Sequence, residues 1–390
     1  MRSLAARPDA RALGLAAVIG STFFLGLAHG IGYPLTAVSF ERWGAPGWLT
    51  GLAAGMPALA ALVLLPFAPR LAFRIGLVPA MAGGCAIGLA GFILMPLMPS
   101  VEAWLVLRFM MGVGLLFPWL LGETWINAAA EEASRGRVLS LYTVALFGGY
   151  GAGPVLLGQI GTEGLQPFIV AGLALSLAVL PLVAAASLAP RIDGHAGGNP
   201  AAVAKLVPLG MSAALIAGVL EYAYIALLPS FASRLGLDEA TGLGLVTAFL
   251  WGGVTLSFGF GWLADRMDRP KLMLMMLVAF PLVALVSGLA TALPGAALAA
   301  IFLLGGLACA FYTLGLAILG ERLRPADLAP ANAAFLVLYQ VGTLAAPPVA
   351  GAAMDAVTPW GFLMAVIGFG LAGLATALVL YRIESRRKTA

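Results

Sequence analysis

Charged residues are scarce in this 390-residue chain. Asp, Glu, Lys and Arg together make up 10% of it, and histidine occurs only twice. Soluble domains contain about 25% charged and about 45–50% apolar residues, whereas this sequence is 62% hydrophobic. A soluble protein has no interior large enough for that much apolar surface, so the composition excludes a soluble globular fold.

Several functional motifs are also missing. The two cysteines, Cys85 and Cys309, both lie within apolar segments, so there is neither a disulfide framework nor a metal-binding spacing. No G-x-x-x-x-G-K-[ST] motif occurs, which argues against ATP as an energy source. The basic residues are scattered between apolar runs, which argues against nucleic-acid binding. No polar segment is long enough for a soluble enzyme domain. We therefore expect no metal, no cofactor, no nucleic-acid partner and no enzymatic activity.

Long apolar runs fill most of the chain. Runs of about 20 apolar residues are typical of transmembrane helices, whereas barrel strands would alternate apolar and polar residues. The first run is longer than the apolar core of a signal peptide, so we interpret it as a retained helix rather than a cleaved leader. The sequence predicts an all-α integral membrane protein with twelve transmembrane helices, at 12–39, 47–68, 76–98, 102–129, 138–160, 166–188, 207–231, 240–264, 271–293, 295–320, 329–352 and 359–381.

The distribution of Lys and Arg predicts the orientation. If the N-terminus is cytoplasmic, only Arg42 and Arg234 fall on the outer side and Arg108 falls within a span, while every other Lys and Arg falls on the cytoplasmic side. Cytoplasmic loops carry an excess of these residues, so both termini are predicted to be cytoplasmic. The preference for Arg over Lys and the many Ala and Gly residues suggest a bacterial source, and hence the bacterial inner membrane.

A polar connection divides the spans into six and six. Residues 191–205 are rich in Gly, Pro and charge, as is typical of a flexible linker. We predict an N-terminal six-helix bundle at 1–190, a cytoplasmic linker at 191–205 and a C-terminal six-helix bundle at 206–390.

The two halves also share a sequence pattern. PRLAFRIGLVPAM in the first half aligns with GWLADRMDRPKLM in the second, which pairs Arg74 with Arg266 at an offset of 192. GYGAGP aligns with GTLAAP, which pairs Gly149 with Gly342 at an offset of 193. A nearly constant offset predicts an internal repeat, here two six-helix pseudo-repeats. Parallel repeats of this kind build one class of transporter, with the solute site between the halves near the membrane midplane.

Four motifs give this pattern a family resemblance. GWLADRMDRPK resembles the signature of the loop after the second helix of each half in the major facilitator superfamily. LVLRFMMGVG, which contains Arg108, resembles its fourth-helix signature, and GETWIN followed by RGR resembles a fourth-helix ending of several bacterial members. GYGAGPVLLG resembles the fifth-helix Gly-Pro signature often found in antiporters and exporters. This chain departs from the loop signature at Phe73, which replaces an acid, and at Asp268, which replaces a glycine. The resemblance implies a twelve-helix secondary transporter and names no substrate.

In that superfamily the loop helps to latch the inward-closed arrangement. The predicted gating residues are Arg74, Glu123, Arg137, Gly261, Asp265, Arg266 and Arg269. Glu123 lies near the cytoplasmic end of its span, where we expect it to pair with Arg74 or Arg137; proton carriage is the alternative. Three residues of the Gly-Pro stretch are expected to allow close packing and bending of helices: Gly149, Gly153 and Pro154.

Ionisable side chains within a span cost about 2.5–3.5 kcal/mol each, so each one needs a reason. His29 and Glu221 lie near the middle of their spans and are offset by 192. We expect the two side chains to face a shared cavity, where either could carry a proton or bind a cationic or hydrogen-bonding solute. The alternative for His29 is a structural histidine bonded to a backbone carbonyl. Arg108 could lower the pKa of a nearby acid or hold a substrate anion, and a structural role in its span is the alternative.

Four further residues are predicted to line that cavity: Tyr33, Tyr224, Trp251 and Gln340. The alternative for the two tyrosines is ordinary aromatic packing. Because no nucleotide motif occurs, the energy source should be an ion gradient, most simply of protons.

The predicted function is secondary active transport of a small organic solute by alternating access, with proton-coupled efflux favoured by the Gly-Pro stretch. Proton-coupled nutrient uptake is the first alternative, and a non-transporting membrane sensor or scaffold is the second. The expected partners are the solute, protons and the lipid bilayer, and the chain is expected to act as a monomer.

Overall fold

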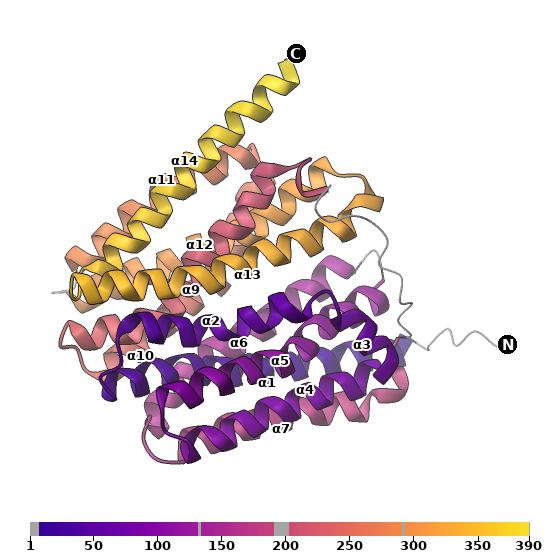
Figure 1. Ribbon diagram of the computed structural model, residues 1–390. Coiled ribbons are helices and arrows are strands. Elements are labelled where there is room, and N and C mark those ends of the chain that lie inside the picture. Colours follow the sequence, from indigo (N-terminus) through magenta and orange to yellow (C-terminus); the bar gives the residue numbers. More distant parts are fainter. Residues whose placement is uncertain (1–7, 132–133, 191–202, 291–292, 390) are drawn as a thin grey trace. The chain divides into compact units, whose positions relative to one another are not determined.

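A computed structural model describes residues 8–131, 134–190, 203–290 and 293–389 (Figure 1). These ranges are helical and contain no strand. The α-helices are α1 (Pro8–Arg42), α2 (Gly47–Leu64), α3 (Ala68–Ile75), α4 (Leu77–Leu94), α5 (Val101–Ala129), α6 (Arg135–Ile160), α7 (Gln166–Ala184), α9 (Pro208–Arg234), α10 (Glu239–Ala264), α11 (Arg269–Leu289), α12 (Pro294–Arg322), α13 (Pro325–Ala356) and α14 (Gly361–Thr389).

Twelve of the helices in the described ranges are long and apolar enough to span a membrane. Each predicted span overlaps one of them, so the predicted all-α, twelve-helix fold is confirmed. One difference follows α2, which ends at Leu64 rather than near residue 68. There the chain forms the short helix α3, which the sequence did not predict. Ala68 and Ala72 are buried on one side of α3, while Arg70 and Arg74 are exposed on the other.

Side-chain caps begin several helices. The Asp238 carboxylate accepts a hydrogen bond from the Thr241 amide at 2.7 Å and begins α10. Asp268 accepts from the Lys271 amide at 3.0 Å and begins α11. A capping carboxylate satisfies an amide that the helix itself leaves unpaired, and it suits the positive end of the helix dipole. Capping explains why an acid stands at position 268, where the superfamily signature has glycine.

The chain divides into two compact units. One comprises Met1–Leu35 and Leu59–His195, and the other comprises Thr36–Ala58 and Ala196–Ala390. The end of α1 and the first part of α2 therefore belong to the second unit. The predicted linker, 191–205, falls mostly outside the described ranges, and the division into bundles 1–190 and 206–390 stays a prediction.

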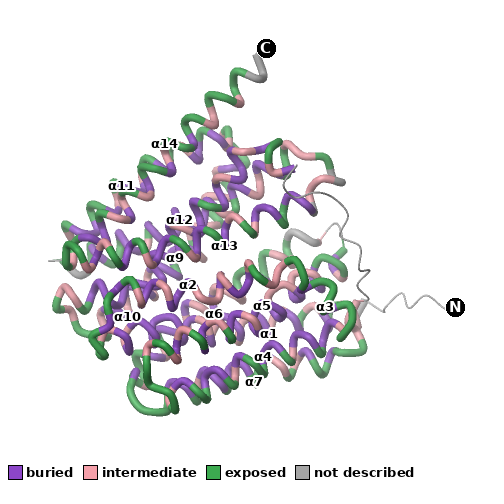
Figure 2. Tube along the Cα trace, viewed as in Figure 1, coloured by how far each residue is buried: buried purple, intermediate pink, exposed green. Residues whose placement is uncertain are grey.

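Each unit is a helical bundle with a buried interior. In the first unit α4 packs against α5 and α7, and in the second α9 packs against α10, α12, α13 and α14. Figure 2 shows buried residues along the central helix α9, and exposed residues that recur between buried ones along α11 and α14. Many of these exposed residues are apolar, including Leu282, Leu285 and Val379. Apolar side chains on the outside of a helix are the pattern that lipid requires.

Close glycine contacts repeat between the two units. A Cβ atom added to Gly26 on α1 would lie 2.1 Å from the Leu146 carbonyl oxygen of α6. A Cβ atom added to Gly218 on α9 would lie 2.2 Å from the Tyr339 carbonyl oxygen of α13. Gly26 and Gly218 are offset by 192, and Leu146 and Tyr339 by 193. The same backbone approach therefore occurs at equivalent places in both halves.

The reciprocal contact repeats as well. A Cβ atom on Gly149 would lie 2.1 Å from the Phe23 carbonyl oxygen, and one on Gly342 would lie 2.5 Å from the Leu215 carbonyl oxygen. In both units two glycines, one on each helix, let the paired helices touch backbone to backbone, as small residues do in membranes. The internal repeat is thus a repeat of packing geometry as well as of sequence.

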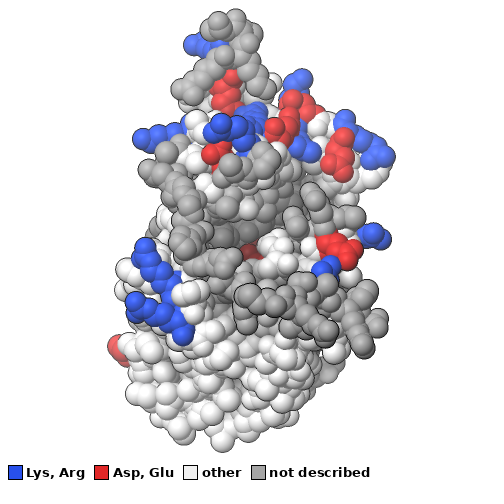
Figure 3. Space-filling model, turned by 90° about the vertical axis from the view of Figure 1, so that its right-hand side faces the viewer, with Lys and Arg blue, Asp and Glu red and all other residues white. Residues whose placement is uncertain are grey.

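Figure 3 shows Lys and Arg side chains on the face that it draws. In the first unit, Arg70 and Arg74 of α3 are exposed, and in the second unit Arg266 and Lys271 near the start of α11 are exposed. This distribution is the one on which the predicted cytoplasmic orientation depends, and the orientation itself stays a prediction.

Replacing Gly26 by Ala should destabilise the protein by about 1–3 kcal/mol, because the added methyl group meets backbone atoms that cannot move aside. Gly20 on the same helix is the matched control, since a Cβ atom there has nothing within 4 Å. Gly20→Ala should be neutral or stabilising by up to about 1 kcal/mol. Thermal unfolding of the two variants in detergent checks this. Equal melting temperatures would contradict the close contact of α1 with α6.

Candidate functional site

The first polar cluster within the helices lies in the first unit. The Arg108 side chain is buried, with 2% of the residue exposed, and its guanidinium carbon lies 4.3 Å from the centre of the Tyr33 ring. The His29 ring stacks on Tyr33 at 6.2 Å and on Tyr150 at 5.4 Å. These residues come from α1, α5 and α6. The structure thus places three predicted cavity residues, His29, Tyr33 and Arg108, side by side, and adds Tyr150, which the sequence analysis did not name.

One ring nitrogen of His29 has a fixed role. Nδ1 lies 2.9 Å from the Leu25 carbonyl oxygen, and a carbonyl can only accept, so Nδ1 carries a hydrogen and donates it. This is the backbone bond expected for a structural histidine. In the neutral ring Nε2 is then an acceptor. A second proton would go to Nε2, so the bond to Leu25 does not prevent proton uptake at the other nitrogen.

The second polar cluster lies in the second unit around Glu221. Glu221 is 3% exposed, and its carboxylate accepts a hydrogen bond from the Tyr339 hydroxyl at 3.0 Å. The Tyr339 ring meets Tyr312 edge to face at 5.2 Å and Tyr222 edge to face at 6.1 Å. The predicted cavity residue Gln340 is the neighbour of Tyr339 on α13 and is also buried. Helices α9, α12 and α13 therefore bring one carboxylate and three tyrosines together.

Two other predicted cavity residues have different surroundings. Tyr224 is fully buried and stacks on Phe249 at 5.1 Å, with Phe362 edge-on at 5.2 Å. Its ring belongs to an aromatic core between α9, α10 and α14, which is the packing alternative left open by the sequence. Trp251 lies on α10 with 39% of its surface exposed. Among the ring contacts of the described residues, none joins Tyr224 or Trp251 to Tyr222, Tyr312 or Tyr339, so we place neither in the second cluster.

The predicted helix-bend residues form close contacts. A Cβ atom on Gly153 would lie 2.3 Å from the carbonyl carbon of Gly30, so α6 touches α1 there as it does at Gly149. Pro154 is buried inside α6. Close packing of this helix is present, while bending during transport stays a prediction.

Charged residues of the gating loop in the second unit lie together at the α10–α11 turn. Arg269 donates to the Ala317 carbonyl at 3.0 Å and to Glu321 at 3.1 Å, and its guanidinium lies 3.9 Å from Asp265. The guanidinium of Arg266 stacks over the Trp262 ring at 3.8 Å, next to Gly261. Glu321 is a member of this cluster that the sequence analysis missed, because it comes from α12, more than fifty residues away.

The corresponding first-half residues do not form the pair that the sequence suggested. Arg74 on α3 and Arg137 on α6 are exposed, and Glu123 on α5 is half-buried. Among the described residues, none of the ion pairs joins Glu123 to Arg74 or Arg137. A charged contact at this end joins Arg11 of α1 to Glu131 instead, at 2.8 Å.

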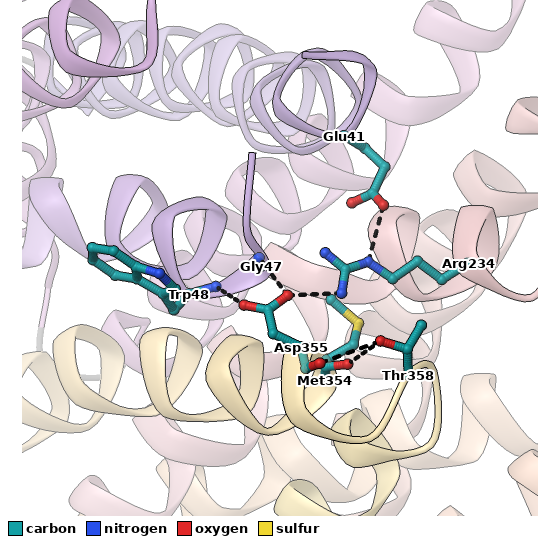
Figure 4. Close-up of polar contacts among 7 residues, drawn as sticks. All are labelled: Glu41, Gly47, Trp48, Arg234, Met354, Asp355 and Thr358. Carbon is teal, nitrogen blue, oxygen red and sulfur yellow. Dashed lines mark hydrogen bonds and ion pairs between the residues drawn. The ribbon is translucent and has the colours of Figure 1, made fainter. Parts of the chain in front are cut away.

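A third cluster, also missed by the sequence analysis, joins residues from both ends of the chain within the second unit (Figure 4). Arg234 at the end of α9 donates to Glu41 of α1 at 2.9 Å and to Asp355 of α13 at 2.8 Å. Beside it, Arg42 pairs with Glu239 at 2.5 Å. We call Glu41, Arg42, Arg234, Glu239 and Asp355 the outer clamp. The sequence contained one signal for this cluster. Arg42 and Arg234 are the two cations that are predicted to lie on the outer side, and they are offset by 192.

Asp355 also caps α2. Its carboxylate accepts from the Gly47 amide at 2.8 Å and from the Trp48 amide at 3.1 Å (Figure 4). The equivalent helix of the second half, α10, is capped by its own Asp238, and hydrogen bonds from Thr241 lower the pKa of that carboxyl. The position offset by 192 from Asp238 is Pro46, which has no capping group. The helix that lacks its own cap is thus capped by a residue from α13.

Comparison with known proteins agrees with this architecture. The family model described as Major Facilitator Superfamily matches residues 18–244 and 210–390. The MFS-type transporter YcaD of Escherichia coli O139:H28 (strain E24377A / ETEC), described as uncharacterized, is 27% identical over 270 residues, which are 68% of this chain and 67% of YcaD. YfkF of Bacillus subtilis (strain 168), described in the same words, is 25% identical over 335 residues, which are 84% and 85% of the two chains.

Two solved structures share the fold over nearly the whole length. One is a bacterial homologue of the human lysosomal transporter Spinster, in an inward-facing and unoccupied conformation, with a TM-score of 0.73, 15% identity and coverage of 97% of this chain and 98% of that chain. The other is the nucleoside transporter NupG, with a TM-score of 0.74, 13% identity and coverage of 95% and 98%. At these identities the likeness shows the fold alone. The chain belongs to the Major Facilitator Superfamily, as the family match and the twelve spans together show. It is a multi-pass secondary transporter of the inner membrane.

Proposed function

We propose that the chain exports a small organic solute across the bacterial inner membrane in exchange for protons, and that Glu221 carries the proton. The observation that carries the proposal is the carboxylate itself, which is 3% exposed in the middle of α9 and bonded to the Tyr339 hydroxyl. A buried carboxylate with a neutral partner is expensive when ionised and inexpensive when protonated. The protonation state of Glu221 therefore depends on whether a solute or another charged group binds next to it.

Tyr339 suits both protonation states of Glu221. Its hydroxyl donates to the ionised carboxylate, and its oxygen can accept from the protonated carboxyl, because a phenol is both donor and acceptor. The hydrogen bond can persist while the proton comes and goes. His29 is a second candidate for proton carriage through Nε2, with Arg108 in the same cluster. The Gly-Pro stretch of α6, which resembles an exporter signature, supports the outward direction.

The outer clamp supplies the contact that alternating access has to break. Glu41 and the start of α2 come from the first half of the chain, while Arg234 and Asp355 come from the second. For the outer side to open, we propose that Asp355 leaves the α2 amides and Arg234 loses at least one carboxylate. We further propose that both termini and the gating loop lie on the cytoplasmic side and that the chain acts as a monomer.

Replacing Glu221 by Gln should abolish proton coupling. Gln can still accept from Tyr339 but cannot exchange a proton near neutral pH. Proteoliposomes with a pH-sensitive dye in the lumen are tested against a panel of small organic solutes. Glu102→Gln is the matched control, because Glu102 is exposed in the first turn of α5.

The sign of the luminal pH change separates the alternatives. Solute added outside should alkalinise the lumen if solute and protons exchange, and should acidify it if they enter together, as nutrient uptake requires. Undiminished coupling in Glu221→Gln would refute the assignment of the proton carrier. No solute flux with any member of the panel would favour the sensor or scaffold.

Replacing Asp355 by Ala should favour opening of the outer side. Loss of the cap on α2 costs about 1 kcal/mol, which corresponds to about a fivefold shift in an opening equilibrium. The reporter is Ser230→Cys, a fully buried position one turn before Arg234, in a background with Cys85→Ala and Cys309→Ala. A membrane-impermeant maleimide added from outside should label it about fivefold faster in Asp355→Ala.

Asp238→Ala is the control for the cap itself. It removes a cap of similar geometry that joins no second segment, so the labelling rate should stay unchanged. An unchanged rate in Asp355→Ala as well would argue that the outer clamp does not hold this side closed.

A further inference from the structure

Three of the eight tyrosines of the chain gather around the buried Glu221. The Tyr339 hydroxyl contacts the carboxylate directly. The rings of Tyr312 and Tyr222 stand nearly perpendicular to the Tyr339 ring, at interplanar angles of 78° and 82°. Tyr222 and Tyr312 are only half-buried, so part of each residue is accessible. The cluster thus combines one carboxylate with aromatic faces from three different helices. Because a tyrosine side chain has few rotatable bonds, these ring faces are held in nearly fixed positions.

Within the described part of the second unit, no Lys or Arg forms an ion pair with the Glu221 carboxylate. None of the ion pairs formed by the described residues includes Glu221, and the cations of these three helices that lie in described positions, Arg234, Arg322 and Arg324, are at helix ends. The first unit differs, because there the Arg108 guanidinium lies over the Tyr33 ring. The residue offset by 192 from Arg108 is Ala300, so the second half has no equivalent cation. When it is ionised, Glu221 therefore has a negative charge that no ion pair among the described residues offsets, and the electron-rich ring of Tyr339 lies beside it.

We propose that Glu221, Tyr222, Tyr312 and Tyr339 form a subsite for the positively charged group of an organic solute, an amine or a quaternary ammonium. Aromatic faces attract such cations, and a desolvated carboxylate attracts them more strongly. Tyr339 holds the carboxylate in place, while Tyr222 and Tyr312 supply ring faces to the alkyl groups around the charge. The inference rests on the proposed function and specifies the substrate class of the same site.

Exchange follows from this arrangement without a second ion site. The solute cation binds the ionised carboxylate, and the proton binds it when the cation has left. Each state of the site then carries the same net charge, so a monovalent cation and a proton replace each other one for one. A neutral solute would not neutralise the ionised carboxylate, so another cation would have to balance its charge.

The test uses purified full-length protein in detergent and three pairs of probes of similar shape. The cations are choline, tetraethylammonium and benzyltrimethylammonium, and each is compared with a neutral analogue in which carbon replaces the charged nitrogen; 3,3-dimethyl-1-butanol serves for choline. We expect at least one cation to raise the melting temperature in a saturable manner, more strongly at higher pH, and its neutral analogue to have no effect. Calorimetry in buffers of different ionisation enthalpy should then show proton release on binding.

Variants separate the parts of the subsite. Glu221→Gln should abolish cation binding, and Glu102→Gln should leave it unchanged. Tyr312→Leu should weaken binding by about two- to thirtyfold, whereas Tyr312→Phe, which keeps the ring face, should retain most of it. Tyr222→Leu and Tyr222→Phe form the same comparison on α9. If Tyr312→Leu fails to fold, this second pair still gives the result.

Failure of the inference is distinguishable from failure of the proposed function. If no cation stabilises the protein, if the neutral analogues stabilise it equally, or if Glu221→Gln still binds the cation, the cation subsite is overturned. If neutral solutes meanwhile drive proton movement in proteoliposomes, the proton-coupled transporter stands with a different substrate class. If cations bind but no solute moves protons, the subsite stands and the proposed coupling fails.

Discussion

The high free energy of charge in hydrocarbon is the constraint on which the rest of this structure depends. Because an ionised group is costly away from water, charged residues are confined to helix ends or to a few interior positions with specific partners. Arg108 has the face of Tyr33, and Glu221 has the hydroxyl of Tyr339. In a sequence with 10% charged residues, a single charged residue in the interior of a span therefore indicates a candidate functional position.

A duplicated fold need not keep duplicated chemistry. The backbone contacts at Gly26 and Gly218 are nearly identical, which shows that the packing of α1 on α6 and of α9 on α13 is preserved. The polar residues have diverged on that shared frame. His29 stands where the second half has Glu221, and Pro46 stands where it has Asp238. Packing tolerates few alternatives at such close approach, whereas a polar side chain can change as long as its new partner satisfies it.

The sequence predicted what depends on local or periodic signals. Apolar runs indicated the twelve spans, and a nearly constant offset indicated the repeat, because both signals depend only on the order of residues along the chain. Contacts that join distant segments were not visible in this way: Asp355 lies 308 residues from the Gly47 amide that it caps. The direction of a side chain was also lost, since Tyr224 lies one turn from Glu221 yet packs against Phe249. The helix α3 was missed because its buried side consists only of Ala68 and Ala72.

The location of the outer clamp follows from the same constraint. A polar contact within hydrocarbon is costly to break, because the separated groups find no replacement partners. At a helix end, water can take the place of Asp355 on the Gly47 and Trp48 amides, and it can solvate Arg234 and Glu41. Contacts that must be made and broken in each transport cycle are therefore favoured at the ends of the helices. Contacts that must persist are favoured inside, where Gly26 and Gly218 bring backbones together without any charge.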